Sequence, residues 1–415
     1  METIKVGVFG VGRGWDIAKN FMMAGAEIVA ICDFNDERRE KVASKIDKSI
    51  AVYKDFDSFI EHHMDAVILA NYFHEHAPYA IKCFEKGIHV FSECISNGTM
   101  AEGVELARAF KDTNSIYFFA ENYPQMKFNR EMKRIVDTGT LGKILFAEGE
   151  YNHPGDPRND DFRKEYNYFP KHWRNFLPRT YYITHSLGPV MRATGATPKV
   201  VSAHAIFAPA DPDVPSASYI GDKAAIITTK NDDGSVFRVT GCAAFGAHDN
   251  SYRICGTNGQ IENLRGMGEK VMLRYNEWQL PEGTKVESFY EPGWNDKDED
   301  FIKQSGHGGG DYITARMFLD CIKEGRQPEH PFDLHSAIAM SSVAILGHRS
   351  MLEGGKPYDI PDFTKEEDIK LYENDRLTPF WGTDGSNPSI PCCSQTDYAP
   401  NETQMSLYKK SLVIE

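Results

Sequence analysis

The 415-residue sequence predicts an α/β N-terminal domain with a parallel sheet, followed by an α+β domain with a mostly antiparallel sheet. Short apolar segments alternate with amphipathic helical ones as far as about residue 120. A glycine-rich turn follows the first apolar segment. Beyond that region, apolar and polar residues alternate along longer strands. We therefore expect a first domain over 1–123, a second over 124–363, and a polar, proline-bearing extension over 364–415 that wraps the surface or a neighbouring subunit.

The stretch 4–21, IKVGVFGVGRGWDIAKNF, predicts a buried strand, a tight turn and the start of a helix. This is how a dinucleotide-binding fold begins, because a pyrophosphate can approach the amides at the helix N-terminus. Gly10, Gly12 and Gly14 permit the close approach. The third glycine lies one place earlier than in the usual fingerprint, so Trp15 takes the position where helix and strand pack closely. An ordinary glycine-rich turn is the alternative.

A second strand, 27–30, leads to Asp33, at the separation at which a carboxylate meets an adenosine ribose. Because a carboxylate would repel a 2′-phosphate, Asp33 favours NAD over NADP. Further elements follow in order. Helices are expected at 34–46, 76–86 and 101–112, and strands at 65–70, 89–92 and 116–120. The strand ends place Asn71, Glu93 and Glu121-Asn122 at the carboxyl edge, where open α/β sheets bind ligands.

The second domain begins with a predicted helix at 125–138 and continues in long alternating strands. These strands are LFAEGEYN, KVVSAHAIF, AAIITTK and FRVTGCAAF, and helical patterns return at 311–324 and 333–353.

Charge and composition restrict the partners. The formal net charge of −14 makes nucleic acid an unsuitable partner, and a neutral substrate fits more easily than an acidic one, although local Lys and Arg could hold a small acidic ligand. No segment has the length and apolarity of a membrane span, and the N-terminus does not resemble a secretory signal. The eight cysteines show neither zinc-type pairs nor a disulfide framework. We expect a cytoplasmic protein without a membrane partner.

Several motifs, in sequence order, resemble the Gfo/Idh/MocA family of nicotinamide-dependent, mostly sugar-directed oxidoreductases. They are GVGRGW, CDFNDERR, DAVILANYFHEHAPYAIKCFEKGIHVFSEC, AENY, TLGKILFAEGEY, YYITHSLGPVM, SYRICGTNGQIEN, GHGGGDYITARMFLDCIKEG and EGGKPYDIPDF. The resemblance implies a Rossmann domain, bound NAD and a homodimer or homotetramer. The expected cofactor-binding residues are Gly10, Val11, Gly12, Arg13, Gly14, Trp15, Asp33, Arg38, Asn71, His76, Glu93, Cys94 and Asn122.

One departure from the family pattern concerns its Glu-Lys-Pro motif, which here reads Glu93-Cys94-Ile95. The family's lysine typically helps to orient or deprotonate the hydroxyl that is oxidised. A cysteine cannot supply a fixed positive charge, so either another group takes the proton or the protein does not oxidise its ligand. A small buried thiol is the simpler interpretation of Cys94.

Tyr182 and His185 are the expected catalytic residues. Their segment resembles the Y-P-T-H-G-L-G-P signature of the NAD-dependent glycosidase branch of the family, and departs from it at Ile183 and Ser186. In that branch the tyrosine and histidine are implicated in proton transfers while NAD takes a hydride and returns it. A neighbouring histidine and a nicotinamide cation could lower the tyrosine pKa. Alternatively, the two residues only begin a helix that packs in the core.

The expected sugar site combines a tryptophan face with cationic and polar donors, which suit a pyranose ring. Its predicted members are Tyr123, Glu150, His153, Lys171, Trp173, Arg174, Tyr181, His307 and Asp311. Asp311 is equally expected as the N-cap of its helix. Glu150 and His153 lie three apart on a strand and therefore face opposite sides, so no metal site is expected.

These observations predict an NAD-dependent oxidoreductase that acts on a ring hydroxyl of a sugar or glycoside, as a redox-assisted glycosidase or a 3-keto-glycoside-forming enzyme. Two alternatives remain. A simple sugar or inositol dehydrogenase would show net NADH formation. A non-catalytic regulatory protein would bind NAD and sugar without turnover, and the missing lysine is its best support.

Overall fold

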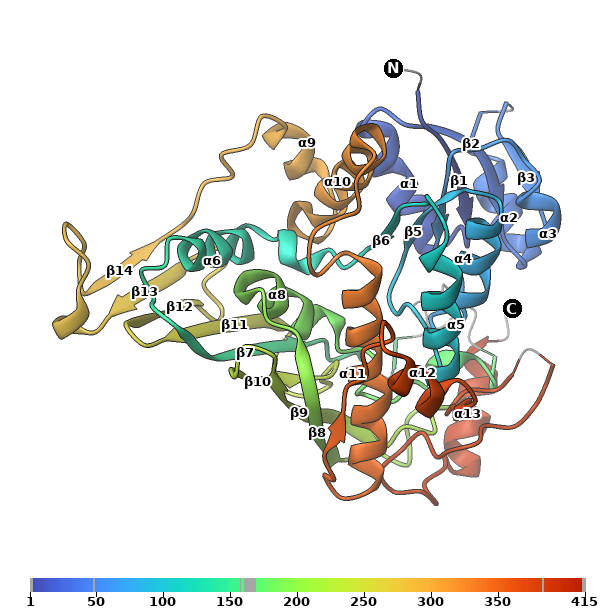
Figure 1. The fold of residues 1–415 in the computed structure, drawn as a ribbon. Helices are drawn as coiled ribbons and strands as arrows, with labels where there is room; N and C mark the ends of the chain where they lie inside the picture. The colour runs from blue at the N-terminus through green and yellow to red at the C-terminus, as the bar shows by residue number, and fades with distance from the viewer. Residues whose placement is uncertain (1–2, 48, 157, 160–168, 383, 413–415) are drawn as a thin grey trace.

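The computed structural model describes residues 3–47, 49–156, 158–159, 169–382 and 384–412. Six parallel strands form the first sheet in the order β3-β2-β1-β4-β5-β6, with helices on its faces (Figure 1). This is the strand order of a dinucleotide-binding domain, as predicted. Its strands are β1 (Lys5–Phe9), β2 (Glu27–Cys32), β3 (Ala51–Tyr53), β4 (Ala66–Leu69), β5 (His89–Ser92) and β6 (Tyr117–Phe119). Its helices are α1 (Arg13–Met23), α2 (Asp36–Ala43), α3 (Phe56–Phe59), α4 (His76–Glu85) and α5 (Met100–Lys111).

The glycine turn after β1 has a steric reason at two positions. Gly10 has a φ of 87°, and a Cβ there would lie 2.3 Å from the carbonyl oxygen of Ala70. A Cβ on Gly14 would lie 2.9 Å from Cγ1 of Val8. The close packing of helix and strand therefore falls at Gly14. This corrects the expectation from the fingerprint that it falls at Trp15, which is only partly buried.

Nine strands form the second sheet, in the order β14-β13-β12-β11-β7-β10-β9-β8-β15. Only β7 and β10 pair in parallel among them, so the sheet is mostly antiparallel, as predicted. Its strands are β7 (Ile144–Asn152), β8 (Pro198–Phe207), β9 (Asp222–Asn231), β10 (Val236–Thr240), β11 (Asp249–Gly256), β12 (Gly259–Asn263), β13 (Val271–Tyr275), β14 (Glu287–Tyr290) and β15 (Tyr358–Asp359).

One face of this sheet is packed against helices α6 (Lys127–Asp137), α8 (Thr184–Thr194) and α11 (Leu334–Leu352). The preceding α9 (Glu299–Gln304) leads to α10 (Gly310–Glu324), which instead packs against α1. Phe318 of α10 lies in one aromatic cluster with Phe21 and Phe91 of the first domain. A helix from the C-terminal half thus completes the core of the nucleotide domain.

The C-terminal extension lies over this chain's own surface. It contains α12 (Glu366–Tyr372) and α13 (Glu402–Leu412). Arg349 of α11 forms an ion pair with Asp375, and Arg108 of α5 forms one with Glu373. Figure 1 shows α13 beside the second domain, where Tyr408 packs with Ala217.

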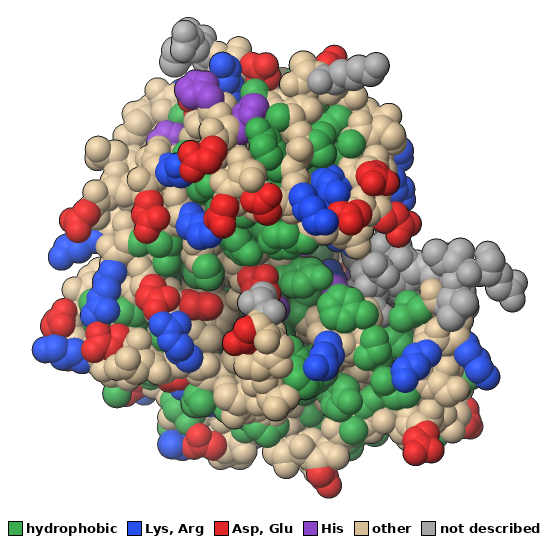
Figure 2. All heavy atoms as spheres, turned by 90° about the vertical axis from the view of Figure 1, so that its right-hand side faces the viewer, with side chains coloured by type: hydrophobic (Ala, Val, Ile, Leu, Met, Phe, Trp, Pro, Cys, Tyr) green, Lys and Arg blue, Asp and Glu red, His purple; other side chains and the backbone are tan. Residues whose placement is uncertain are grey.

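Within the described part of the chain, no helix has the length and apolarity needed to cross a membrane. On the face in Figure 2, the acidic and basic side chains drawn in colour are interspersed and form no basic patch. All eight cysteines are free thiols.

Candidate active site

The carboxyl edge of the first sheet forms a cradle that fits a dinucleotide. At the helix N-terminus, Gly12 is exposed, and the nearest atom to a Cβ there would be Nη1 of Arg38 at 3.5 Å. The side-chain oxygens of Asn71 and Asn122 are buried without a hydrogen-bond partner among the described residues. An open glycine backbone beside two unpaired buried acceptors is what a polar ligand at this edge requires.

Asp33 stands at the end of β2 and braces the glycine turn. One carboxylate oxygen accepts the Val11 N–H at 2.8 Å, and the other accepts the Asn35 N–H at 2.8 Å. A carboxylate oxygen has more than one lone pair, so Asp33 retains capacity for a ribose hydroxyl.

We therefore expect tighter binding of NAD than of NADP, because the Asp33 carboxylate would repel a 2′-phosphate. Titration of both cofactors should show a preference of at least about tenfold, equivalent to roughly 1.4 kcal/mol. Asp33→Ala should narrow that preference. Tighter binding of NADP by the unmodified protein would refute the assignment.

Arg13 connects the glycine turn to the second half of the chain. Its guanidinium donates to Glu93 at 3.2 Å and to Asp311 at 2.9 Å. Asp311 also accepts from the amide of Asn122 at 2.7 Å and lies 3.0 Å from Nδ1 of His307. Burial raises the pKa of Asp311, but His307 and Arg13 hold it well below the ordinary value. The N-cap of α10 is Gly309, so the alternative role of Asp311 as the cap is wrong.

His76 is 1% exposed at the start of α4, and its Nδ1 lies 2.7 Å from the carbonyl oxygen of Ile95. Burial lowers the pKa of this imidazole to about 4. The ring is therefore neutral at physiological pH and fixes the segment that follows β5.

A hydrogen-bonded relay of Tyr182, His185 and Glu121 lies where the two domains meet. The phenol oxygen of Tyr182 is 3.1 Å from Nε2 of His185. Nδ1 of the same ring is 2.9 and 3.0 Å from the two carboxylate oxygens of Glu121. Tyr182 lies just before Ile183, the N-cap of α8, and His185 lies in the first turn of that helix. Glu121 follows β6.

Two glycines explain how α8 reaches this position. A Cβ on Gly188 would lie 2.7 Å from Cγ of Glu121, so only glycine lets the helix approach the carboxylate. On β7, a Cβ on Gly149 would lie 2.0 Å from the carbonyl oxygen of Ser186. The sequence thus brings α8 against both the carboxylate and the sheet.

The contacts of His185 determine which ring nitrogen can accept a proton. A carboxylate only accepts hydrogen bonds, so Nδ1 of the imidazole must donate to Glu121. In the neutral ring Nε2 is then the acceptor and faces the Tyr182 hydroxyl. Burial raises the pKa of Glu121, but the charge and hydrogen bond of His185, together with hydrogen bonds from Thr184 and Tyr123, hold this pKa below its ordinary value. The relay can therefore receive a proton from Tyr182.

The phenol of Tyr182 has a pKa well above its ordinary value, because burial disfavours the phenolate and Cys242 and Tyr123 add to the effect. Arg174 lowers this pKa, but burial and the other groups outweigh it, so the net shift is upward. This corrects the expectation that the neighbouring His185 brings the pKa down. Loss of the phenol proton must therefore be coupled to its acceptance by Nε2 or to a cation bound nearby.

Cys94 lies beside the relay, in the segment that follows β5. Its buried thiol donates to Glu121 at 3.5 Å. Burial, together with Glu121 and Glu93, raises the thiol pKa well above its ordinary value. A neutral thiol supplies no charge to a developing alkoxide.

Cys94→Ala is therefore expected to keep most of the turnover, because the thiol fills space beside Glu121. Steady-state kinetics with cofactor titration test this. A loss of a hundredfold or more at unchanged cofactor affinity, about 2.7 kcal/mol of transition-state stabilisation, would show that the thiol has a chemical role.

A cavity of about 460 Å³ adjoins Tyr182 and is a candidate sugar site. Three of the predicted residues, His153, Arg174 and Tyr182, line it together. Tyr408 of α13 contributes to its wall, so the C-terminal extension takes part in the site. The other lining residues are Gly155, Asp156, Asn159, Asn175, Leu177, Arg179, Pro215, Ser216, Ala217, Ser218, Ile220, Lys223, Cys242 and Ala244.

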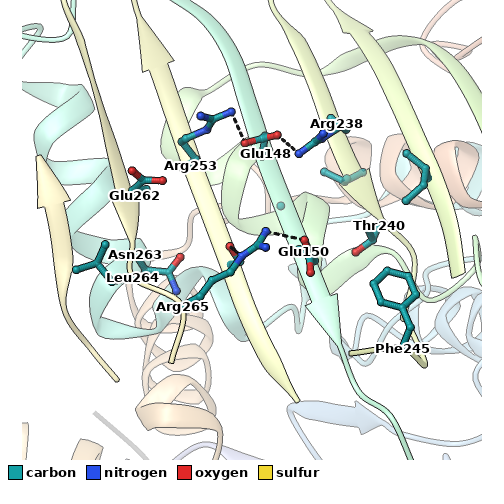
Figure 3. A pocket seen from close by; sticks show the side chains of 14 residues that line it. Glu148, Glu150, Arg238, Thr240, Phe245, Arg253, Glu262, Asn263, Leu264 and Arg265 are labelled. Atoms are coloured by element: carbon teal, nitrogen blue, oxygen red, sulfur yellow. Dashed lines mark hydrogen bonds and ion pairs between the residues drawn. The ribbon is translucent and has the colours of Figure 1, made fainter. Parts of the chain in front are cut away.

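Glu150 does not join this cavity, because it lies on the opposite face of β7. Its carboxylate pairs with Arg265 at 2.8 Å across the sheet (Figure 3). There it lines a separate hollow of about 570 Å³ together with Glu148 and Arg253. Because side chains alternate between the two faces along the strand, Glu150 and His153 lie in different cavities.

Three other predicted sugar-site residues pack elsewhere. Tyr181 is fully buried, with its ring against His348 and Phe380. The ammonium of Lys171 lies 3.7 Å from the ring centroid of Trp381. Trp173 stacks on Phe73, at 5.4 Å between centroids. Phe73 in turn packs against the ring of Tyr182. Trp173 therefore contacts the relay only indirectly, through Phe73.

Tyr123 stacks on the His185 ring with 3.9 Å between centroids, and its own ring is 5% exposed. Tyr151, which was not predicted, packs edge-on against Tyr123, His185 and Tyr182. The sequence indicates Glu121 only as a residue at a strand end. The alternation of side chains along β7 could have indicated that Tyr151 faces the interior. Only the folded chain shows which ring nitrogen of His185 contacts Glu121.

Among the described residues, no group of three or more His, Cys, Asp or Glu side chains is arranged to hold a metal ion.

Comparison with known families gives two matches along the chain. Residues 4–121 match the oxidoreductase family with an NAD-binding Rossmann fold, Gfo/Idh/MocA. Residues 217–370 match the C-terminal domain of glycosyl hydrolase 109. The chain is 26% identical over 400 residues to glycosyl hydrolase family 109 protein 2 of Akkermansia muciniphila, covering 88% of this chain and 84% of that protein. A family 109 protein of Streptomyces niveus is 26% identical over 431 residues, covering 94% and 82%.

Solved structures share the fold. A levoglucosan dehydrogenase in complex with NADH and L-sorbose superposes with a TM-score of 0.71 at 20% identity, covering 87% of this chain and all of that one. A myo-inositol 2-dehydrogenase from Lactobacillus plantarum gives a TM-score of 0.63 at 18% identity, covering 87% and 100%.

Proposed function

Because the chain joins a Gfo/Idh/MocA NAD-binding Rossmann domain to a glycosyl hydrolase 109 C-terminal domain, we propose that it is an NAD-dependent glycosidase working through transient oxidation of a sugar ring hydroxyl. The observation that carries the proposal is the Tyr182–His185–Glu121 relay beside the 460 Å³ cavity. A proton acceptor at this position removes the need for the family's lysine.

The relay moves the proton of the reacting hydroxyl in two linked steps. The ring hydroxyl gives its proton to the phenol oxygen of Tyr182 as the phenol proton passes to Nε2 of His185. Glu121 stabilises the resulting imidazolium through Nδ1. Bound NAD would accept the hydride from the same carbon and later return it, held over Gly10–Gly14 with Asp33 at its ribose.

Loss of the proton and the hydride leaves a ring ketone, and the C–H beside that ketone becomes acidic. That C–H loses its proton and the glycosidic C–O bond breaks, so a C=C bond forms and the aglycone leaves with a proton as the free alcohol. Water then adds across the C=C bond, giving a proton to one carbon and a hydroxyl to the other. Return of the hydride to the ketone carbon and of the proton from Tyr182 to its oxygen would restore the ring hydroxyl. No pair of catalytic carboxylates is needed, which distinguishes this cycle from ordinary glycoside hydrolysis.

The test uses aryl glycosides and free sugars in D₂O, with NADH absorbance, aglycone release and product labelling followed together. We expect aglycone release without net NADH, and deuterium beside the carbon that was oxidised. Net NADH without aglycone would instead identify a sugar or inositol dehydrogenase. Binding without either product would favour a regulatory protein.

We also propose that the chain assembles as a homodimer or homotetramer. The face of the second sheet that carries Glu148 and Arg253 is the one opposite α6, α8 and α11, and it is hollowed. Light scattering coupled to size exclusion measures the assembly, and a monomeric mass across the working concentration range would reject it.

A further inference from the structure

The described charged side chains that line the cavity beside Tyr182 are mainly basic, although the whole chain is acidic. The chain contains 60 acidic and 46 basic residues. Among the described residues, the lysine, arginine and carboxylate side chains that line the cavity are Arg174, Arg179, Lys223 and Asp156. Asp156 is exposed and already accepts the N–H of Arg158.

Arg179 and Lys223 bring positive charge to this wall, and no ion pair with a carboxylate of the described residues is formed by either of them. The Arg179 guanidinium donates to the backbone carbonyls of Asp222 at 2.9 Å and Cys242 at 3.4 Å. These carbonyls orient the group, but being neutral acceptors they do not cancel its charge. Lys223 forms no ion pair with a described residue, and burial and the repulsion of Arg179 lower its pKa, against a weaker effect of Asp211. The sequence alone favoured a neutral substrate because only the total charge was available.

The cationic wall is connected to the relay through the backbone. The backbone carbonyl of Tyr182 accepts the N–H of Cys242 at 3.0 Å. The carbonyl of Cys242 in turn accepts a hydrogen bond from the Arg179 guanidinium. On β9, the carbonyl of Lys223 accepts the N–H of Ala244. A sugar at Tyr182 would therefore have both cations within the same cavity. Leu177, Ala217, Ile220 and Tyr408 supply apolar surface to that cavity.

We propose that this cavity selects glycosides that carry an anionic substituent, a carboxylate or a sulfate ester, which Arg179 and Lys223 bind. This inference rests on the proposed glycosidase function and specifies its substrate class. An anion at this point would give the two cations a counter-charge that they do not receive through an ion pair with any residue the structure describes.

The experiment compares matched aryl glycosides: the neutral hexoside, the corresponding hexuronide and the 6-sulfate. Calorimetry in the presence of NAD measures binding, and aglycone release is followed separately. We expect at least one anionic member to bind ten times or more tightly than its neutral partner, with the ratio falling as salt rises. Comparing the hexuronide with the 6-sulfate identifies which anion is preferred.

Lys223→Met should bring the ratio of anionic to neutral affinity towards one. Lys230→Met is the matched control, because Lys230 is exposed on the same strand outside the cavity and should leave the ratio unchanged. Melting temperatures verify that both variants fold. Equal affinities for neutral and anionic members, or an unchanged ratio in Lys223→Met, overturns the inference. Anion-selective binding without aglycone release would instead count against the glycosidase cycle.

Discussion

Tyr182→Phe should lower turnover by about 10²–10⁴, the contribution that general acid–base catalysis supplies. The change removes only the hydroxyl that lies 3.1 Å from Nε2 of His185. The ring remains to pack against Phe73 and Tyr151, so folding should be preserved. Single-turnover kinetics on an aryl glycoside, with NAD affinity measured in parallel, test the role of the phenol.

Tyr181→Phe is the matched control. Its hydroxyl is buried, has no hydrogen-bond partner among the described residues, and its ring faces His348 and Phe380. The turnover of Tyr181→Phe should stay close to that of the unmodified protein. His185→Ala should resemble Tyr182→Phe, and the double variant should lose little more than either single one, because one proton-transfer unit is already broken. Normal turnover in Tyr182→Phe would exclude Tyr182 as the base.

The order of elements in the nucleotide domain could be predicted from the sequence because its signals are local. Buried parallel strands read as short apolar runs, and Gly10–Gly14 marks the turn after the first of them. The close packing at Gly14 was missed, because it depends on where Val8 lies in the folded sheet. The fingerprint gives the order of the glycines but not their contacts.

The candidate site was predictable only in part. Tyr182 and His185 lie three apart at a helix start, so their meeting is a local event. Glu121 lies 64 residues before His185, and no periodicity connects them. Likewise, Lys171 and Tyr181 were placed in the sugar site by residue type. Their actual partners, Trp381 and Phe380, come from the C-terminal extension, whose path the sequence did not specify.

The charge of the cavity could not be predicted from the sequence either. Arg179 and Lys223 stand far apart in the sequence and meet because a loop before α8 lies against the start of β9. Total composition predicts the sign of the long-range field, whereas the sign inside a cavity depends on which few side chains line it. A strongly acidic chain can therefore contain a basic pocket.

Glu121→Gln tests whether the carboxylate positions His185. The substitution keeps the size of the side chain but removes the charge that fixes Nδ1–H and stabilises an imidazolium. The amide of glutamine can also donate a hydrogen bond to Nδ1. The neutral ring would then carry its proton on Nε2, and a protonated Nε2 cannot accept the proton of Tyr182. We expect turnover to fall by about 10²–10⁴, with NAD affinity nearly unchanged.

A purely structural role for Glu121 would not alter the pH dependence of the chemistry, so the pH–rate profile decides the question. Without the carboxylate, Nδ1–H of His185 loses its charged acceptor, so the pH–rate profile of the variant should differ in shape from that of the unmodified protein. Stability gives a second readout. The folded pKa of Glu121 lies below its ordinary value of 4.5, so its stabilising effect is complete above that pH and is lost as the pH falls through the lowered value. The melting-temperature advantage of the unmodified protein over Glu121→Gln should accordingly shrink below pH 4.5. Full turnover with an unshifted profile in Glu121→Gln would show that Tyr182 and His185 work without the carboxylate.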